Sequence, residues 1–195
     1  TFDAGKTTPA AVVFGDFFGR GIHHIFIGPD HILFVVTLLL LGGSMGRLLK
    51  IVTAFTIAHS ITLVLAALGI LSPPASLVEP VIALSIVFTA AHALLGQGRR
   101  DPRQLFAFGF GLIHGFGFAF VIQEMTLPAA ARGWSLLAFN LGVEAGQCAI
   151  VLAVAPVFAL LRRWRPAFAE RAVTATALGA AAMGALWFFQ RVMPV

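Results

Sequence analysis

Residues 22–42, IHHIFIGPDHILFVVTLLLLG, form a segment long enough to cross a membrane, yet three histidines and an aspartate lie within it. A transmembrane helix needs about 20 mostly apolar residues. The second half of this segment is almost entirely apolar, whereas the first half contains Gly28-Pro29. A proline inside a helix removes a backbone hydrogen bond and kinks the helix. We therefore expect a membrane span that is disturbed at Gly28, with ionisable side chains beside the disturbance.

The composition of the whole chain supports a membrane protein. Of its 195 residues, 59% are hydrophobic and only 11% are charged, and the mean hydropathy is +0.95. A water-soluble domain carries about 25% charged residues, so a soluble enzyme and a nucleic-acid-binding module are both excluded. The net charge of +5 comes from arginine clusters between apolar runs. The single cysteine, Cys148, excludes an intrachain disulfide framework and Cys-rich metal sites.

The expected fold is an all-α integral membrane protein with about six transmembrane helices. Residues 1–21 are expected to form an outer segment, in which the stretch AAVVFGDFFGRG (10–21) lies as a short helix on the membrane surface. Residues 22–195 are expected to form a single transmembrane domain. Its expected spans are residues 22–42, 49–71, 79–96, 105–123, 135–161 and 169–190.

The basic residues predict the orientation of these spans. Four of the 13 lie on one side, at Lys6, Arg20, Arg132 and Arg191. The other nine flank the three loops of the opposite side: Arg47, Lys50, Arg99, Arg100, Arg103, Arg162, Arg163, Arg165 and Arg171. Because cytoplasmic loops carry an excess of Lys and Arg, we expect both termini outside. A bacterial inner membrane is the expected location.

The first span offers a candidate metal site. His24 and His31 are seven residues apart, which on a continuous helix would place them on nearly the same face. With Asp30 they supply two nitrogen donors and one oxygen donor, a set that nickel, cobalt and zinc accept. The alternative is that His23 and His24 lie at the membrane interface and Asp30 only caps the helix after the break.

Three further ionisable residues are expected near the middle of the membrane: His59, His114 and Glu144. Such residues usually face the interior of a bundle and serve a function. His114 lies in a glycine-rich span that allows another helix to approach closely, whereas His92 lies toward the cytoplasmic end. The serines and threonines of the spans are expected to form hydrogen bonds between helices. Together the histidines and carboxylates predict a series of metal-compatible groups across the bilayer.

These residues resemble the HupE/UreJ family of small membrane proteins. The signature of its first span, His-Pro-x-x-Gly-x-Asp-His, is matched by His24, Gly28, Asp30 and His31, with Ile25 in place of proline. Segments similar to the second branch of the family are 55–60 (FTIAHS), Glu79 with 82–85 (IALS), 110–117 (FGLIHGFG) and 139–147 (FNLGVEAGQ). The resemblance implies a nickel or cobalt permease rather than an enzyme.

The sequence leaves two kinds of function open. The first is a permease for a divalent transition metal, most simply nickel or cobalt, with zinc or copper as alternatives. The second is an accessory subunit of a larger membrane complex that binds a metal or a haem, for which His59 and His114 could supply axial ligands. The metalloprotease motif His-Glu-x-x-His is absent. Membrane lipids and a metal ion are the expected partners, together with a second copy or another subunit and without nucleic acid.

Overall fold

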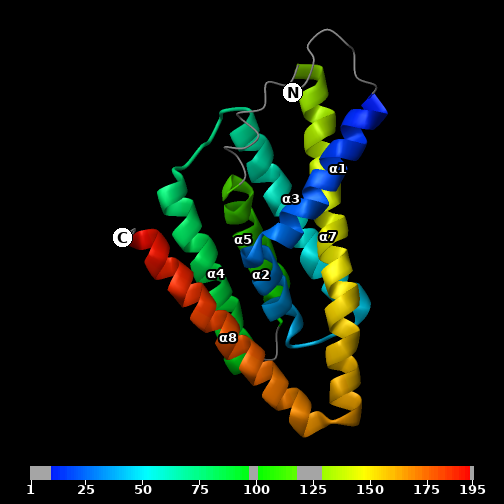
Figure 1. The fold of residues 1–195 in the computed structure, drawn as a ribbon, viewed down its shortest axis with the longest axis vertical. Helices are drawn as coiled ribbons and strands as arrows, with labels where there is room; N and C mark the ends of the chain where they lie inside the picture. The colour runs from blue at the N-terminus through cyan, green and yellow to red at the C-terminus, as the bar shows by residue number, and fades with distance from the viewer. Residues whose placement is uncertain (1–9, 97–100, 118–128, 194–195) are drawn as a thin grey trace.

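A computed structural model describes residues 10–96, 101–117 and 129–193 of the chain, and all regular structure in these ranges is α-helical. The prediction of an all-helical protein is therefore confirmed over the described residues. Figure 1 shows the helices and their labels. They are α1 (Ala10–Ile27), α2 (Pro29–Leu39), α3 (Met45–Ala67), α4 (Ala75–Leu95), α5 (Arg103–Gly117), α7 (Ala129–Trp164) and α8 (Pro166–Val192).

Four of these helices are long and apolar enough to cross a membrane: α3, α4, the part of α7 from Gly133, and α8. The pair formed by α1 and α2 meets the same test as one bent span. Only 15 residues of α5 are described, and the rest of the expected span 105–123 lies outside the described residues. The structure thus agrees with a helical membrane bundle, while six spans and the orientation of the termini stay predictions.

The N-terminal part of the chain differs from the expected surface helix followed by a new span. One helix, α1, runs without interruption from Ala10 to Ile27, and the boundary lies at Gly28 instead of Gly21. Gly28 is extended (φ −86°, ψ 96°), Pro29 is the first residue of α2, and the two helices meet at a bend of 73°. The expected disturbance at Gly28 is therefore confirmed, whereas Gly21 lies inside a helix because it packs against another helix.

Glycines bring three pairs of helices into close contact. A β-carbon added to Gly142 of α7 would lie 3.0 Å from the α-carbon of Gly21 in α1. One added to Gly111 of α5 would lie 3.1 Å from an α-carbon of α3, and one added to Gly184 of α8 would lie 3.0 Å from a carbonyl oxygen of α4. Small residues at helix contacts permit this close packing in membranes. The expected close approach to the glycine-rich span around His114 is thus confirmed.

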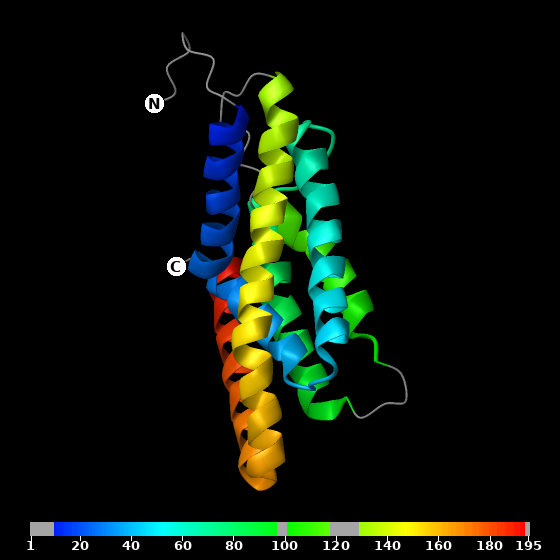
Figure 2. The ribbon, with the colours of Figure 1, turned by 90° about the vertical axis from the view of Figure 1, so that its right-hand side faces the viewer.

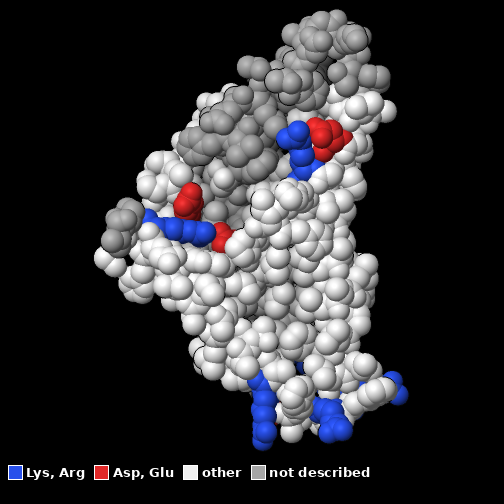
Figure 3. All heavy atoms as spheres, viewed as in Figure 1, with Lys and Arg blue, Asp and Glu red and all other residues white. Residues whose placement is uncertain are grey.

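The short helix α2 lies in the interior of the bundle, in contact with α1, α4, α7 and α8 (Figures 1 and 2). Four of its apolar side chains are almost completely buried, with Phe34, Val35, Leu38 and Leu39 exposed by 2% or less. The side of the molecule drawn in Figure 3 has a broad uncharged band between basic residues at the bottom and charged residues higher up. Such a band is typical of a protein surrounded by lipid.

Arginine side chains bind the carbonyl groups at the C-terminal end of α2. Arg103, 4% exposed, donates to the carbonyl oxygens of Leu38 and Gly42, each at 2.7 Å, and Arg162 donates to that of Leu40. Asp101 accepts from Arg103 at 2.7 Å, and this hydrogen bond lowers the pKa of the carboxyl group from 3.8 to about 2. A helix end carries partial negative charge on its free carbonyls, so the arginines stabilise it. The structure thereby brings together basic residues from two of the three loops expected on one side.

Candidate metal centre

Two histidines meet at the bend between α1 and α2. His24 lies in the last turn of α1 and His31 in the first turn of α2, and their ring centroids are 4.6 Å apart. Gly28 makes this approach possible, because a β-carbon at this position would lie only 2.7 Å from Nδ1 of His31. The backbone N–H of His31 donates to the carbonyl of Gly28 at 3.0 Å. The bend itself, rather than a shared helix face, brings the two imidazoles together.

A third histidine from α3 completes the cluster. The ring of His59 lies 6.2 Å from that of His24 and 6.4 Å from that of His31. One ligand atom from each of the three residues lies within 4.8 Å of the others, so the three could hold a metal ion. Ligand nitrogens of a tetrahedral zinc site are about 3.3 Å apart, as follows from Zn–N bonds of about 2.05 Å. Small rotations of the side chains would therefore suffice to bind a metal.

Hydrogen bonds fix how His59 presents its nitrogens. Its Nδ1 lies 3.2 Å from Oδ1 of Asn140 in α7, and the amide nitrogen of Asn140 donates to the carbonyl of Leu136 at 2.9 Å. The Asn140 oxygen therefore accepts a hydrogen bond from the N–H group at Nδ1 of His59. The other ring nitrogen, Nε2, then carries the lone pair; it is buried and has no hydrogen-bond partner among the described residues.

His114 of α5 lies beside the cluster without belonging to the group of three. Its ring is 5.1 Å from that of His31 and packs against the rings of Phe34 and Phe55, at 5.1 Å and 5.2 Å. Its Nε2 lies 3.1 Å from Oγ of Ser85. The fourth histidine expected from the sequence thus comes from a different helix and adjoins the cluster through His31.

Asp30 lies at the start of α2, but its carboxylate turns to another partner. Its Oδ2 forms an ion pair with Arg191 at 2.8 Å, and Arg191 also donates to the carbonyl of Glu79 at 3.0 Å. The second oxygen, Oδ1, is buried with no partner in the described part of the chain. Asp30 is not one of the three clustered ligands. No local pattern in the sequence points to Arg191 as this partner, because it is a single basic residue far away at the end of α8.

Glu144 lies on another part of the α3–α7 interface. Its Oε1 accepts from Thr53 at 2.5 Å, while Gln147, one turn further along α7, accepts from Thr56 at 2.9 Å. The expected hydrogen bonds between helices are confirmed here. Oε2 of Glu144 is buried and unpartnered within the described ranges. Glu144 is not one of the three residues that could hold a metal ion among the described residues.

The remaining two histidines are not members of the cluster. His23 is exposed, and His92 packs edge-on against Phe106 with 5.1 Å between ring centroids. Neither is one of the residues grouped as potential metal ligands in the described chain. This separation agrees with the absence of His23 from the family signature.

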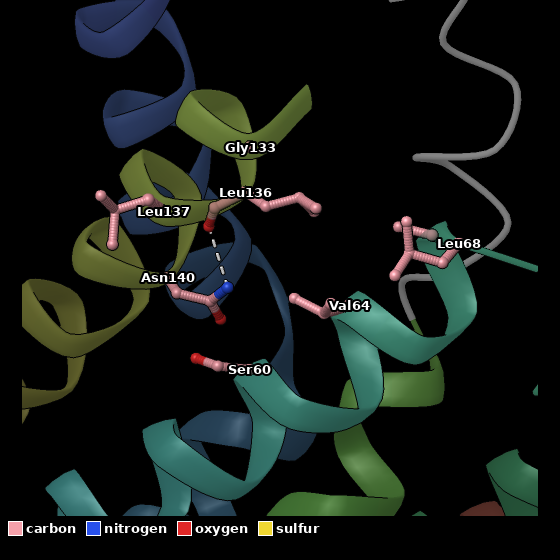
Figure 4. A pocket seen from close by; sticks show the side chains of 8 residues that line it. Ser60, Val64, Leu68, Gly133, Leu136, Leu137 and Asn140 are labelled. Carbon is pink, nitrogen blue, oxygen red and sulfur yellow. Dashed lines mark hydrogen bonds between the residues drawn. The ribbon is translucent and has the colours of Figure 1, made fainter. Parts of the chain in front are cut away.

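A groove of about 470 Å³ lies between α3 and the first described turns of the α7 span (Figure 4). Its walls are mostly apolar, and Ser60 and Asn140 are its polar members. Figure 4 shows the Asn140 amide pointing toward the space between these helices, with its bond to the Leu136 carbonyl dashed. One of the residues that line the groove, Asn140, is therefore the residue that is hydrogen-bonded to His59.

These features define an α-helical membrane protein with a buried histidine cluster at a broken helix. The family described as HupE / UreJ protein matches residues 4–191, and the chain belongs to this family. The family is linked in general to the transport of metals such as nickel and cobalt and is not a known enzyme family. Searches of curated proteins and of solved structures gave no match.

Proposed function

We infer that the protein is a permease for a divalent transition-metal ion, with nickel or cobalt as the preferred substrate. The observation that supports this most strongly is the histidine cluster: three imidazoles from α1, α2 and α3 whose ligand atoms lie within 4.8 Å inside an apolar bundle. Ionisable residues inside a membrane are rare and mark the pathways of ions. A bacterial inner membrane, with both termini outside, is the proposed setting.

The donor set selects the class of ion. Neutral imidazole nitrogens suit nickel, cobalt, zinc and copper, whereas magnesium and calcium prefer oxygen ligands. His31 and His59 are 7% and 0% exposed, so an ion bound there exchanges its water shell for nitrogen ligands. The broken helix also frees backbone carbonyls near the site, as in transporters with discontinuous helices.

The proposed route of the ion has three binding positions. Asp30 would attract the ion on the outer side, the histidines would bind it after dehydration, and Glu144 would receive it on the way to the arginine-rich end. The buried, unpartnered oxygens of Asp30 and Glu144 among the described residues support these roles. Because the chain carries no ATP-binding loop, an ion gradient or a partner would drive the transport.

An accessory subunit that binds haem is less well supported. A porphyrin needs a flat open space on the ligand side of an axial histidine, but the rings of Phe34 and Phe55 pack against His114. A Soret band in the purified protein would favour haem and contradict the permease.

The decisive experiment combines binding and uptake. The full chain is purified in detergent, titrated with nickel, cobalt, zinc and copper, and then reconstituted into vesicles for uptake assays. We expect binding of at least one of these ions and its uptake into vesicles, with both reduced at least ~10-fold by His59→Ala. His23→Ala, at an exposed position, is the matched control and should change neither. Binding without uptake would indicate an accessory subunit instead.

A further inference from the structure

Both the nitrogen and the oxygen of the Asn140 side-chain amide form hydrogen bonds. This determines which ring nitrogen of His59 carries the proton and which carries the lone pair. The amide group of Asn140 donates to the Leu136 carbonyl at 2.9 Å, so its oxygen is the atom that lies 3.2 Å from Nδ1 of His59. An amide oxygen only accepts hydrogen bonds. His59 must therefore carry its proton on Nδ1 and its lone pair on Nε2.

Ser85 determines the tautomer of His114, which is opposite to that of His59. A hydroxyl group has one proton to donate, and that of Ser85 goes to the Ile82 carbonyl at 2.6 Å. The oxygen of Ser85 consequently accepts from Nε2 of His114 at 3.1 Å. His114 must carry its proton on Nε2 and its lone pair on Nδ1, which is buried and unpartnered within the described residues.

His31 lies close to both of these fixed imidazoles. Its ring is 5.1 Å from that of His114 and 6.4 Å from that of His59. Both of its ring nitrogens are buried and have no hydrogen-bond partner in the described chain. Two imidazoles with assigned lone pairs thus flank a third that is free to turn either nitrogen to a ligand.

We propose that Asn140 and Ser85 are positioning residues of the metal centre: they hold His59 and His114 in opposite tautomers and so present His59 Nε2 and His114 Nδ1 beside His31. This inference rests on the proposed function, and it extends the cluster to an additional nitrogen donor. The resulting site is neutral and consists of imidazoles. It accepts nickel, cobalt, zinc or copper and rejects magnesium and calcium, which need oxygen ligands.

Hydrogen bonds to the outer nitrogen of a ligating histidine fix its orientation, and their loss costs about 10- to 100-fold in metal affinity. We expect this loss for Asn140→Leu and Ser85→Ala, measured with Co²⁺ titrated into the full chain in detergent. Both variants should also shift the visible absorption bands of bound Co²⁺. Asn140→Asp keeps an oxygen acceptor for His59 and should restore the affinity to within about 3-fold of wild type.

Thr37→Val is the matched control. Thr37 forms a buried hydrogen bond between α2 and α4, with Thr89 at 2.8 Å, and its hydroxyl group also donates to the Phe34 carbonyl at 2.8 Å, not to a histidine of the described chain. It should leave the affinity and spectrum of bound Co²⁺ unchanged. Equal damage by Thr37→Val, or wild-type binding by Asn140→Leu and Ser85→Ala, would overturn the positioning role.

A measurement on the wild-type protein avoids any dependence on folding of the variants. In metal-free protein labelled with ¹⁵N-histidine, nuclear magnetic resonance should show His59 protonated on Nδ1 and His114 protonated on Nε2. The same tautomer for both residues would contradict the inference even if metal binds. Opposite tautomers without any metal binding would support the positioning by Asn140 and Ser85 but contradict the proposed function.

Discussion

The two ends of α2 differ in whether their buried polar groups have hydrogen-bond partners. At its C-terminal end, Arg103 and Arg162 donate to three carbonyl oxygens, and Asp101 binds Arg103 in turn. At its N-terminal end, His31 lies at a broken helix with both ring nitrogens buried and unpartnered among the described residues. The 11 residues of this helix therefore connect two different ends. We call the C-terminal end, whose carbonyl groups accept hydrogen bonds from arginines, the bonded end. We call the N-terminal end, where the His31 nitrogens have no partner among the described residues, the open end.

This difference separates structural from functional polar groups. Buried polar atoms that lack a partner cost free energy, so proteins normally pair them. Where the chain supplies permanent partners, as the arginines do, the polar groups hold the fold together. Where several lone pairs lie together without protein partners, the arrangement favours a ligand.

The largest effect is expected at the bonded end. Arg103→Met removes a buried cation and leaves the carbonyls of Leu38 and Gly42 unpaired, which should lower the free energy of unfolding by about 3–5 kcal/mol. Thermal unfolding in detergent measures this loss, and Arg163→Met, at an exposed position, should have little effect. Metal affinity of the folded fraction should stay as in wild type. A stable variant with lost metal binding would reverse the roles assigned to the two ends.

At the open end, Asp30→Asn should weaken metal binding at least ~10-fold, the size of effect seen even for indirect partners of a metal site. The substitution removes the negative charge that offsets a divalent cation, and it also ends the ion pair with Arg191. Titration of the purified variant with nickel and cobalt measures the change. His23→Ala should do much less, and if it is the more damaging change, the assignment of Asp30 is wrong.

The sequence predicted much of this open end but not its partners. The pair Gly28-Pro29 was enough to place the break, because its backbone chemistry is local. The expected meeting of His24 and His31 rested on helix periodicity, whereas the structure joins them through a 73° bend. The roles of Arg191 and Asn140 depend on contacts between distant helices, with 161 and 81 residues of separation. No local pattern in a single sequence carries such information.

The bend can be tested without touching a ligand. In Gly28→Ala the added β-carbon would lie 2.7 Å from Nδ1 of His31, so the ring must leave its present position beside His24. We expect nickel or cobalt affinity to fall by about 10-fold with the helical content unchanged by circular dichroism. Gly109→Ala is the matched control, since no atom lies within 4 Å of its added β-carbon. Equal affinities in both variants would remove Gly28 from the site.

Glu144 is an intermediate case, because only one of its two carboxylate oxygens has a hydrogen-bond partner among the described residues. Thr53 binds one of its oxygens, and the other is buried and unpartnered over the described ranges. If open lone pairs mark the route of the ion, Glu144→Gln should lower uptake into vesicles while metal affinity of the histidine cluster and thermal stability change little. Unchanged uptake would make Glu144 a packing residue that bonds Thr53.

The smallest effect is expected from pH at the bonded end. Arg103 lowers the pKa of Asp101 from 3.8 to about 2 in the folded protein, so the folded state binds this proton less readily than the unfolded state. The ionised carboxylate therefore stabilises the fold above about pH 4, and this stabilisation is lost as the pH falls from about 4 to about 2. Asp101→Asn should be less stable at neutral pH, and its unfolding temperature should approach that of wild type as the pH falls through this range. If the difference between the two proteins stays constant over that range, the Asp101–Arg103 pair does not stabilise this end of α2 through its charge.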